Sequence, residues 1–451
     1  MKRTLIHNAM IINEGTCTQG SLVIEGDRIA EVLTNGKPLS APCDETIDAT
    51  GCYLIPGVID DHVHFREPGM THKANIFSES RAAAAGGVTS IMDMPNTKPA
   101  TVTMDALHEK MDLLNEKCLV NHACYYGATD KNFMDFARLP KVGVAGIKLF
   151  MGATTGSIQV SSYRGLLNVL TTTDRLIAAH CESQQIIEEN TKLIQKLYIN
   201  DEIPVNKHPM IRSEEACYES SKQLVKMAQK AGTRLHLLHL STIREINLLD
   251  KKTPLAEKKI TSEVTVGHLF FNAADHKEKG GLIKVNPAIK TTNHRTALRK
   301  AMINGTIDVV ATDHAPHLLS EKEGGALTAA SGMPSIQFSL LTMLKLMDDK
   351  KNPFGIETIV ERMCHNPATI FHIPNRGFIR EGYKADLVLI RKQEEPWTLT
   401  RDMVLSPCGW SPFEGEKYNW KVERTFVNGR LAYQNGEIDD AVRGEELEFN
   451  V

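Results

Sequence analysis

The sequence lacks the features that define several classes of protein. No stretch approaches the roughly 18 uninterrupted apolar residues of a membrane-spanning helix, and no basic run stands out that could follow a phosphate backbone. Lys and Arg total 52 against 55 Asp and Glu, which gives a formal net charge of −3. We therefore expect a soluble globular protein, with neither a membrane nor a nucleic acid as a partner.

The cysteines lack the spacing of a disulfide framework or of a cysteine metal site. There are nine of them, an odd number, and no C-x-x-C pair occurs. This pattern favours free thiols in a reducing compartment. The N-terminal apolar stretch is interrupted by His7 and Asn8 and lacks a small-residue cleavage site, so we read no signal peptide and expect a cytoplasmic protein.

The length and the texture of the chain predict a large central unit with an attachment. At about 150 residues per domain, 451 residues allow three small units or one large barrel with an addition. Residues 1–54 and 371–451 alternate short β-rich runs with turn signals such as Asn428-Gly429. Two β-rich ends around a different middle suggest one small β-sandwich domain built from both termini, with residues 55–370 as a separate domain.

The middle of the chain reads as repeated strand-helix units. Eight apolar, β-branched runs occur, near 54–64, 88–94, 119–126, 144–151, 175–180, 234–240, 260–266 and 307–313. Helical patterns follow most of them, at 76–85, 104–115, 183–198, 213–230, 291–303 and 335–347. This arithmetic predicts an α/β protein with a (β/α)8 TIM-like barrel, and a doubly wound open sheet is the rival. The stretch 181–232 is long enough for two helices, so we expect an insertion after the fifth strand.

Polar side chains gather where the predicted strands end, which is where barrels of this kind build their active sites. His62 and His64 share one face of the first strand because side chains alternate at period 2. Each residue alone has an ordinary explanation, as a core histidine, a strand lysine reaching solvent or a helix cap. Their shared position at strand ends makes a metal site the better explanation. The set is His62, His64, Lys148, His180, His239 and Asp313.

The residue types indicate which metal this site would hold. Histidines and a carboxylate without cysteine suit zinc (Zn2+), with manganese or cobalt able to substitute. Two ions are plausible, one on His62, His64 and Asp313 and the other on His180 and His239. Such a pair needs an anionic bridge. Lys148 could supply it as a carbamate, formed by reaction of its amine with carbon dioxide.

Several motifs carry a resemblance to a known family. They are PGVIDDHVHFREPG at 56–69, MPN at 94–96, KLF at 148–150, AHCE at 179–182, HLLHLS at 236–241 and DHAPH at 313–317. Together they resemble the metal-dependent hydrolases of the amidohydrolase superfamily, and within it the dihydroorotase group of cyclic amidases. The resemblance extends to NPA at 366–368 and GYKADL at 382–387, so it covers essentially the whole chain.

The resemblance implies a role for each metal-site residue. His62, His64 and Asp313 would hold one zinc ion, His180 and His239 a second, and carboxylated Lys148 would bridge them. His236 would be a neighbour rather than a ligand. Many long-chain dihydroorotases have an aspartate where this chain has Lys148, but the segment 148–157 resembles the lysine type. We therefore expect both metal positions to be filled.

The resemblance also implies the substrate contacts. Arg66, Asn96 and His317 would hold a ring carboxylate, and Asn286 would be a further contact. The alternatives are a surface salt bridge for Arg66 and a turn role for Asn286. Dihydropyrimidinases or hydantoinases and allantoinases are the rival enzymes, disfavoured by Arg66 and the 94–96 motif. A non-catalytic relative that serves as a partner protein is disfavoured because all six metal positions are filled.

The implied activity is the reversible conversion of L-dihydroorotate to N-carbamoyl-L-aspartate in pyrimidine biosynthesis. Two metals would lower the pKa of a bridging water to produce hydroxide near neutral pH. Asp313 would be the catalytic residue that takes the proton and delivers it to the departing ring nitrogen. We further expect a homo-oligomer, with a dimer favoured, and a mobile loop at 317–334 that covers the substrate.

Overall fold

The computed structural model describes residues 1–152, 158–160, 162–199 and 201–450. The expectation that rests on Ala153, Thr154 and Thr155 lies outside these described residues.

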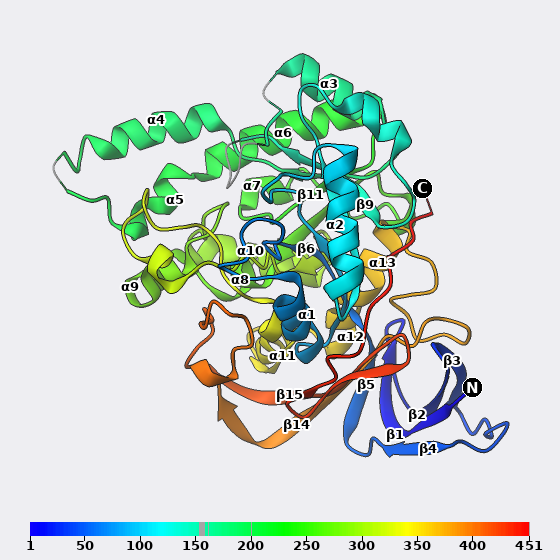
Figure 1. Ribbon diagram of the computed structural model, residues 1–451. Helices are drawn as coiled ribbons and strands as arrows, with labels where there is room; N and C mark the ends of the chain where they lie inside the picture. The colour runs from blue at the N-terminus through cyan, green and yellow to red at the C-terminus, as the bar shows by residue number, and fades with distance from the viewer. Residues whose placement is uncertain (153–157, 161, 200, 451) are drawn as a thin grey trace.

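Eight parallel strands form the centre of the molecule (Figure 1). Each strand pairs with the next one along the chain. The sheet closes where the backbone N–H of His64 donates to the carbonyl of His314 at 2.7 Å. This closure confirms the predicted barrel and excludes the open sheet. The strands are β6 (Val58–Val63), β7 (Val88–Asp93), β8 (Asn121–Gly127), β9 (Val144–Phe150), β10 (Ile177–His180), β11 (Leu235–Leu237), β12 (Ile260–Thr265) and β13 (Val309–Ala311).

Helices surround the barrel and follow the predicted pattern closely. Several begin after a capping side chain, for example where the Thr103 hydroxyl accepts from Ala106 N–H and the Ser213 hydroxyl from Ala216 N–H. The longer helices are α1 (Ile76–Ala85), α2 (Met104–Lys117), α3 (Tyr163–Thr171), α4 (Gln184–Gln195), α6 (Glu214–Ala231), α10 (Thr292–Ile303) and α11 (Ser339–Asp348). The shorter ones are α5 (His208–Ile211), α7 (Ile243–Ile246), α8 (Val266–Phe270), α9 (His276–Lys279), α12 (Ile356–Val360) and α13 (Asn366–Ile370).

The insertion between β10 and β11 is present as predicted, and it carries α4, α5 and α6. In Figure 1, α4 extends outward from the barrel. One predicted helix begins later than expected: residues 336–338 form a 3-10 turn before α11 starts at Ser339. The reason is local, because Ser335 donates its N–H to His314 Nδ1 at 3.0 Å and its hydroxyl to the carbonyl of Thr312 at 3.2 Å.

The two ends of the chain form a second sheet of nine strands. Residues of β5 pair antiparallel with β14, with Pro56 opposite Leu387, so the N-terminal and C-terminal strands belong to one continuous sheet. Gly57 separates β5 from β6, and a Cβ at this position would lie 2.0 Å from Thr89 Oγ1. The strands are β1 (Arg3–Asn13), β2 (Thr16–Glu25), β3 (Arg28–Thr34), β4 (Glu45–Asp48), β5 (Cys52–Pro56), β14 (Leu387–Thr398), β15 (Lys417–Val427), β16 (Arg430–Gln434) and β17 (Glu437–Ile438).

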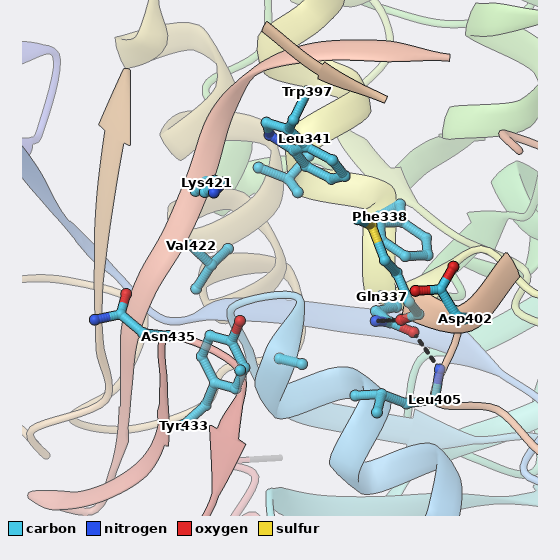
Figure 2. Close-up of a pocket in the computed structure, with 13 residues that line it drawn as sticks. Gln337, Phe338, Leu341, Trp397, Asp402, Leu405, Lys421, Val422, Tyr433 and Asn435 are labelled. Carbon is cyan, nitrogen blue, oxygen red and sulfur yellow. Dashed lines mark hydrogen bonds between the residues drawn. The ribbon is translucent and has the colours of Figure 1, made fainter. Parts of the chain in front are cut away.

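An apolar cavity of about 550 Å³ lies where the barrel meets the strands β14 to β16. Figure 2 shows Trp397 and Leu341 on one side of it and Tyr433 on another, and Gln337 accepts a hydrogen bond from the backbone N–H of Leu405 at 2.9 Å. This cavity shares no lining residue with the site described below. Within the described part of the chain, no helix is both long and apolar enough to cross a membrane.

Candidate metal centre

One cavity at the carboxyl ends of the barrel strands gathers the predicted site residues. All of them line it except His317, which lies against Arg66. His62 belongs to β6, Lys148 to β9 and His180 to β10, while His239 and Asp313 follow β11 and β13 by two residues. The lining residues are His62, His64, Arg66, Asn96, Lys148, Phe150, His180, His239, Asn286, Asp313, Ala315, Ser331 and Gly332.

His62, His64 and Asp313, which we call the cavity group, bring three ligand atoms within 4.8 Å of one another. The Nε2 atoms of His62 and His64 lie 3.2 Å and 3.1 Å from Asp313 Oδ1. Burial by itself raises the pKa of Asp313, but the two histidines outweigh it and hold that pKa well below its usual value. This set of two imidazoles and one carboxylate matches the donors that a divalent cation such as zinc prefers.

His180 and His239 form a second pair of donors in the same cavity. Their Nδ1 and Nε2 atoms, respectively, lie 2.9 Å apart. Burial lowers the pKa of both rings, which favours the neutral imidazole that binds metals. His239 Nδ1 is buried without a hydrogen-bond partner among the described residues. Converging neutral histidines of this kind fit a second cation.

Lys148 is close enough to both sets of donors for its charge to shift their pKa values. Its charge acts on His62 and Asp313 and also on His180 and His239. The side chain is 1% exposed, and burial lowers its pKa to about 8. An amine with this pKa is partly neutral near physiological pH, as reaction with carbon dioxide requires.

Three histidines of the cavity have their second ring nitrogen held by an oxygen, a recurrent feature of metal sites. Glu263 Oε1 lies 2.6 Å from His62 Nδ1, Asn96 Oδ1 lies 2.9 Å from His64 Nδ1, and Glu182 Oε2 lies 3.0 Å from His180 Nε2. The sequence predicted Asn96 as a substrate contact only. It missed Glu263 and Glu182, although a carboxylate inside an apolar strand run was the available signal for Glu263.

Beneath the cavity lies a second group of three side chains, Asp61, His236 and Glu263, which we call the buried group. His236 Nε2 lies 3.2 Å from Asp61 Oδ2 and 3.8 Å from Glu263 Oε2. All three side chains are inaccessible to solvent. His236 thus faces two carboxylates below the cavity and does not line it.

Arg66 is a buried wall of the cavity and not a surface salt-bridge partner. It is 2% exposed, its Nε donates to the carbonyl of Pro316 at 3.0 Å, and its Nη2 lies 3.0 Å from His317 Nε2. Burial lowers its pKa to about 10, so it remains a cation at neutral pH. Trp410 in turn donates its indole N–H to the carbonyl of His317 at 2.8 Å. Asn286 also lines the cavity, and its buried Oδ1 has no hydrogen-bond partner among the described residues.

Three residues of the site adopt a left-handed backbone. The φ angles are 67° at Arg66, 37° at His239 and 48° at Asp313. A non-glycine residue in such a region costs about 1–3 kcal/mol, and such positions cluster at functional sites. The chain therefore accepts local strain to aim these side chains into one cavity.

The loop at 317–334 is packed against the barrel in this structure. Lys322 is buried and donates to the carbonyls of Lys284, Ala330 and Gly332 at 3.1, 2.6 and 2.6 Å. Ser331 and Gly332 line the cavity, so the loop forms one of its walls. The predicted motion of this loop stays a prediction.

The fold and the site define a metal-dependent hydrolase. The chain belongs to the amidohydrolase family, whose model matches residues 53–432. It is 31% identical to a dihydroorotase of Methanosarcina acetivorans over 98% of this chain and 95% of that protein. It is 29% identical to an allantoinase of Bacillus velezensis over 96% and 94% of the two chains.

Among solved structures, the L-hydantoinase (dihydropyrimidinase) of Arthrobacter aurescens superposes with a TM-score of 0.90. It is 24% identical, and the alignment covers 99% of this chain and 100% of that one. This likeness concerns the fold alone.

Proposed function

We propose that the chain is a dihydroorotase, a metal-dependent hydrolase of cyclic amides that interconverts L-dihydroorotate and N-carbamoyl-L-aspartate. The observation that carries the proposal is the buried guanidinium of Arg66 on the wall of the histidine-lined cavity. Dihydroorotate has a carboxylate on its ring, and a guanidinium can bind it through two parallel hydrogen bonds. Dihydropyrimidines lack that carboxylate. The near full-length similarity to a dihydroorotase supports the same substrate.

The metal ligands belong to this proposal. His62, His64 and Asp313 would hold one zinc ion, His180 and His239 a second, and carboxylated Lys148 would bridge them. The converging donors and the lowered pKa of Lys148 support the assignment. Divalent ions at such positions polarise an amide carbonyl and lower the pKa of water.

The side chains of the cavity would then transfer the proton and bind the substrate. Asp313, ionised at neutral pH, accepts the proton of the attacking water and delivers it to the departing ring nitrogen. Arg66 binds the ring carboxylate, and His317, held through its carbonyl by Trp410, fixes the position of Arg66. Asn96 and His317 would hold the ring carboxylate together with Arg66, and Asn286 would be a further substrate contact.

The test is a comparison of substrates with one zinc-loaded preparation. We expect dihydroorotate to be hydrolysed with a higher kcat/KM than hydantoin, dihydrouracil or allantoin. Arg66→Ala should lower the value for dihydroorotate selectively. A parent protein that prefers an uncharged ring or allantoin would overturn the proposal and favour a hydantoinase or an allantoinase.

Two further predictions concern the protein in the cell. We propose a homodimer, to be measured by light scattering coupled to gel filtration of the purified chain. We also propose a cytoplasmic location, to be measured by fractionation of expressing cells.

A further inference from the structure

We infer that Glu263 is a positioning residue that couples the two sets of metal donors. This inference rests on the metal ligands assigned in the proposed function. Glu263 belongs to β12, and its Oε1 lies 2.6 Å from His62 Nδ1 and accepts the backbone N–H of His239 at 2.8 Å. His62 belongs to one set of donors and His239 to the other, so a single carboxylate oxygen contacts both.

The contact with His62 determines which ring nitrogen is available to a metal. An ionised carboxylate only accepts hydrogen bonds, so His62 Nδ1 carries the proton. The lone pair then lies on Nε2, the atom that faces Asp313 Oδ1 at 3.2 Å. Glu263 thereby selects the ring tautomer that can bind a cation in the cavity group.

The contact with His239 holds a strained backbone in place. His239 has a φ of 37°. Its N–H donates to the Glu263 side chain, and the next N–H, of Leu240, donates to the Glu263 carbonyl at 2.9 Å. Two successive backbone donors are therefore anchored on one residue, and this anchoring directs the His239 ring toward His180.

The second oxygen of Glu263 faces His236, another member of the buried group. Oε2 lies 3.8 Å from His236 Nε2, which is beyond hydrogen-bond distance, and the side chain has no accessible surface. A glutamine can keep its single acceptor oxygen at His62 and His239, with the NH2 group toward His236, or it can turn the NH2 group toward His62 and lose the acceptor for both. Glu182 and Asn96 differ from Glu263, because each contacts one predicted ligand, His180 and His64 respectively.

The experiment compares Glu263→Ala and Glu263→Gln with a matched control, Glu245→Gln. Glu245 is also buried, but its carboxylate contacts Ser221 and Thr242 and no predicted ligand. Zinc is the probe, and its stoichiometry and dissociation constants are measured by competition with a chelating dye. The tautomer of His62 is read from the ring ¹⁵N shifts of zinc-loaded, histidine-labelled protein, because in the metal-free protein the carboxylates of Glu263 and Asp313 favour a doubly protonated ring.

We expect Glu263→Ala to weaken zinc binding at both positions by about 10-fold to 100-fold, the range of comparable outer contacts. Glu263→Gln should show a smaller loss and a new population of Nε2-protonated His62, because its amide can also donate. Glu245→Gln should bind zinc like the parent. Should the alanine variant fail to fold, the isosteric glutamine variant decides the question.

Parental zinc affinity and an unchanged His62 tautomer in the Glu263 variants would overturn the inference. So would an equal loss of affinity in Glu245→Gln, which would indicate a general structural effect. Neither readout involves substrate. A parent protein that binds two zinc ions yet hydrolyses another cyclic amide would therefore contradict the proposed function and leave the inference on Glu263 standing. A parent that binds no zinc would contradict both.

Discussion

The cavity group and the buried group contain the same kinds of side chain but differ in how accessible these side chains are. In the cavity group, His64 and Asp313 have 12% and 14% of their side-chain surface exposed, and His62 has 2%. In the buried group the corresponding value is 0% for Asp61, His236 and Glu263. A metal and a substrate can reach only the first set. The comparison teaches that a cluster of histidine and carboxylate side chains is a ligand set or a support depending on access.

The largest losses of activity should come from changes at Asp313 and Lys148, of which Asp313 supplies the carboxylate of the cavity group. Asp313→Ala should lower kcat by about 10³-fold or more in both directions, because one residue moves the proton in hydrolysis and in ring closure. The measurement is the rate of each reaction at fixed zinc concentration. Asp61→Asn is the matched change in the buried group and should cost only about 10-fold to 100-fold. Equal losses would remove the distinction between the two groups.

Lys148→Ala should abolish turnover and the binding of one of the two metal ions, because the two ions would repel each other without an anionic bridge. Metal content by elemental analysis, beside turnover of dihydroorotate, checks this outcome. Added acetate should restore part of the activity by supplying the missing carboxylate. Full metal occupancy in the variant would refute the carbamate assignment.

The buried group should make the free energy of unfolding depend on pH. Burial lowers the pKa of His236, but Asp61 and Glu263 outweigh it and raise the pKa from 6.5 to about 9. A raised histidine pKa stabilises the folded state fully below about pH 6.5, and this stabilisation is lost as the pH rises through about 9. The shift corresponds to on the order of 3 kcal/mol.

Urea unfolding of zinc-free protein at about pH 6 and about pH 9.5 measures this effect. We expect the parent to lose free energy of unfolding between the two conditions. His236→Gln should remove most of that slope. Identical slopes in the two proteins would show that the charge of His236 does not support the site.

The smallest expected effect concerns the substrate end of the cavity. Arg66→Lys should lower kcat/KM for dihydroorotate by an amount that corresponds to about 1–3 kcal/mol of lost transition-state stabilisation. The reason is that an ammonium replaces a two-pronged contact with a single charge. Zinc content should not change, since Arg66 contacts Pro316 and His317 and no predicted ligand. Parental turnover by Arg66→Ala would remove the carboxylate assignment.

The sequence predicted the barrel from local patterns, and it predicted the cavity group from the place of its residues at the ends of the predicted strands. Strand β6 combines an apolar run with His62, and His64 follows it, so periodicity alone places both rings on one face. The same reasoning missed Glu263 and Asp61, which lie within strands whose pattern predicts burial. Their contacts join residues about 200 positions apart, as between His62 and Glu263, and only the closed barrel brings these together.

Other parts of the fold depended on contacts that no local pattern contains. Helix α11 begins at Ser339 and not at the predicted residue 335, because Ser335 is hydrogen-bonded to His314 in the loop after β13. The terminal strands were predicted as strands, but their pairing through β5 and β14 joins segments more than 300 residues apart. Likewise, Trp410 reaches the site from the C-terminal part of the chain to hold His317.

The most direct test of the account is to locate the metals by anomalous scattering in crystals of the zinc-loaded protein, with data on both sides of the zinc absorption edge. The account predicts two peaks per chain in the cavity, one between His62, His64 and Asp313 and one between His180 and His239, both next to Lys148. A peak between Asp61, His236 and Glu263, or a cavity that holds no zinc, would contradict it.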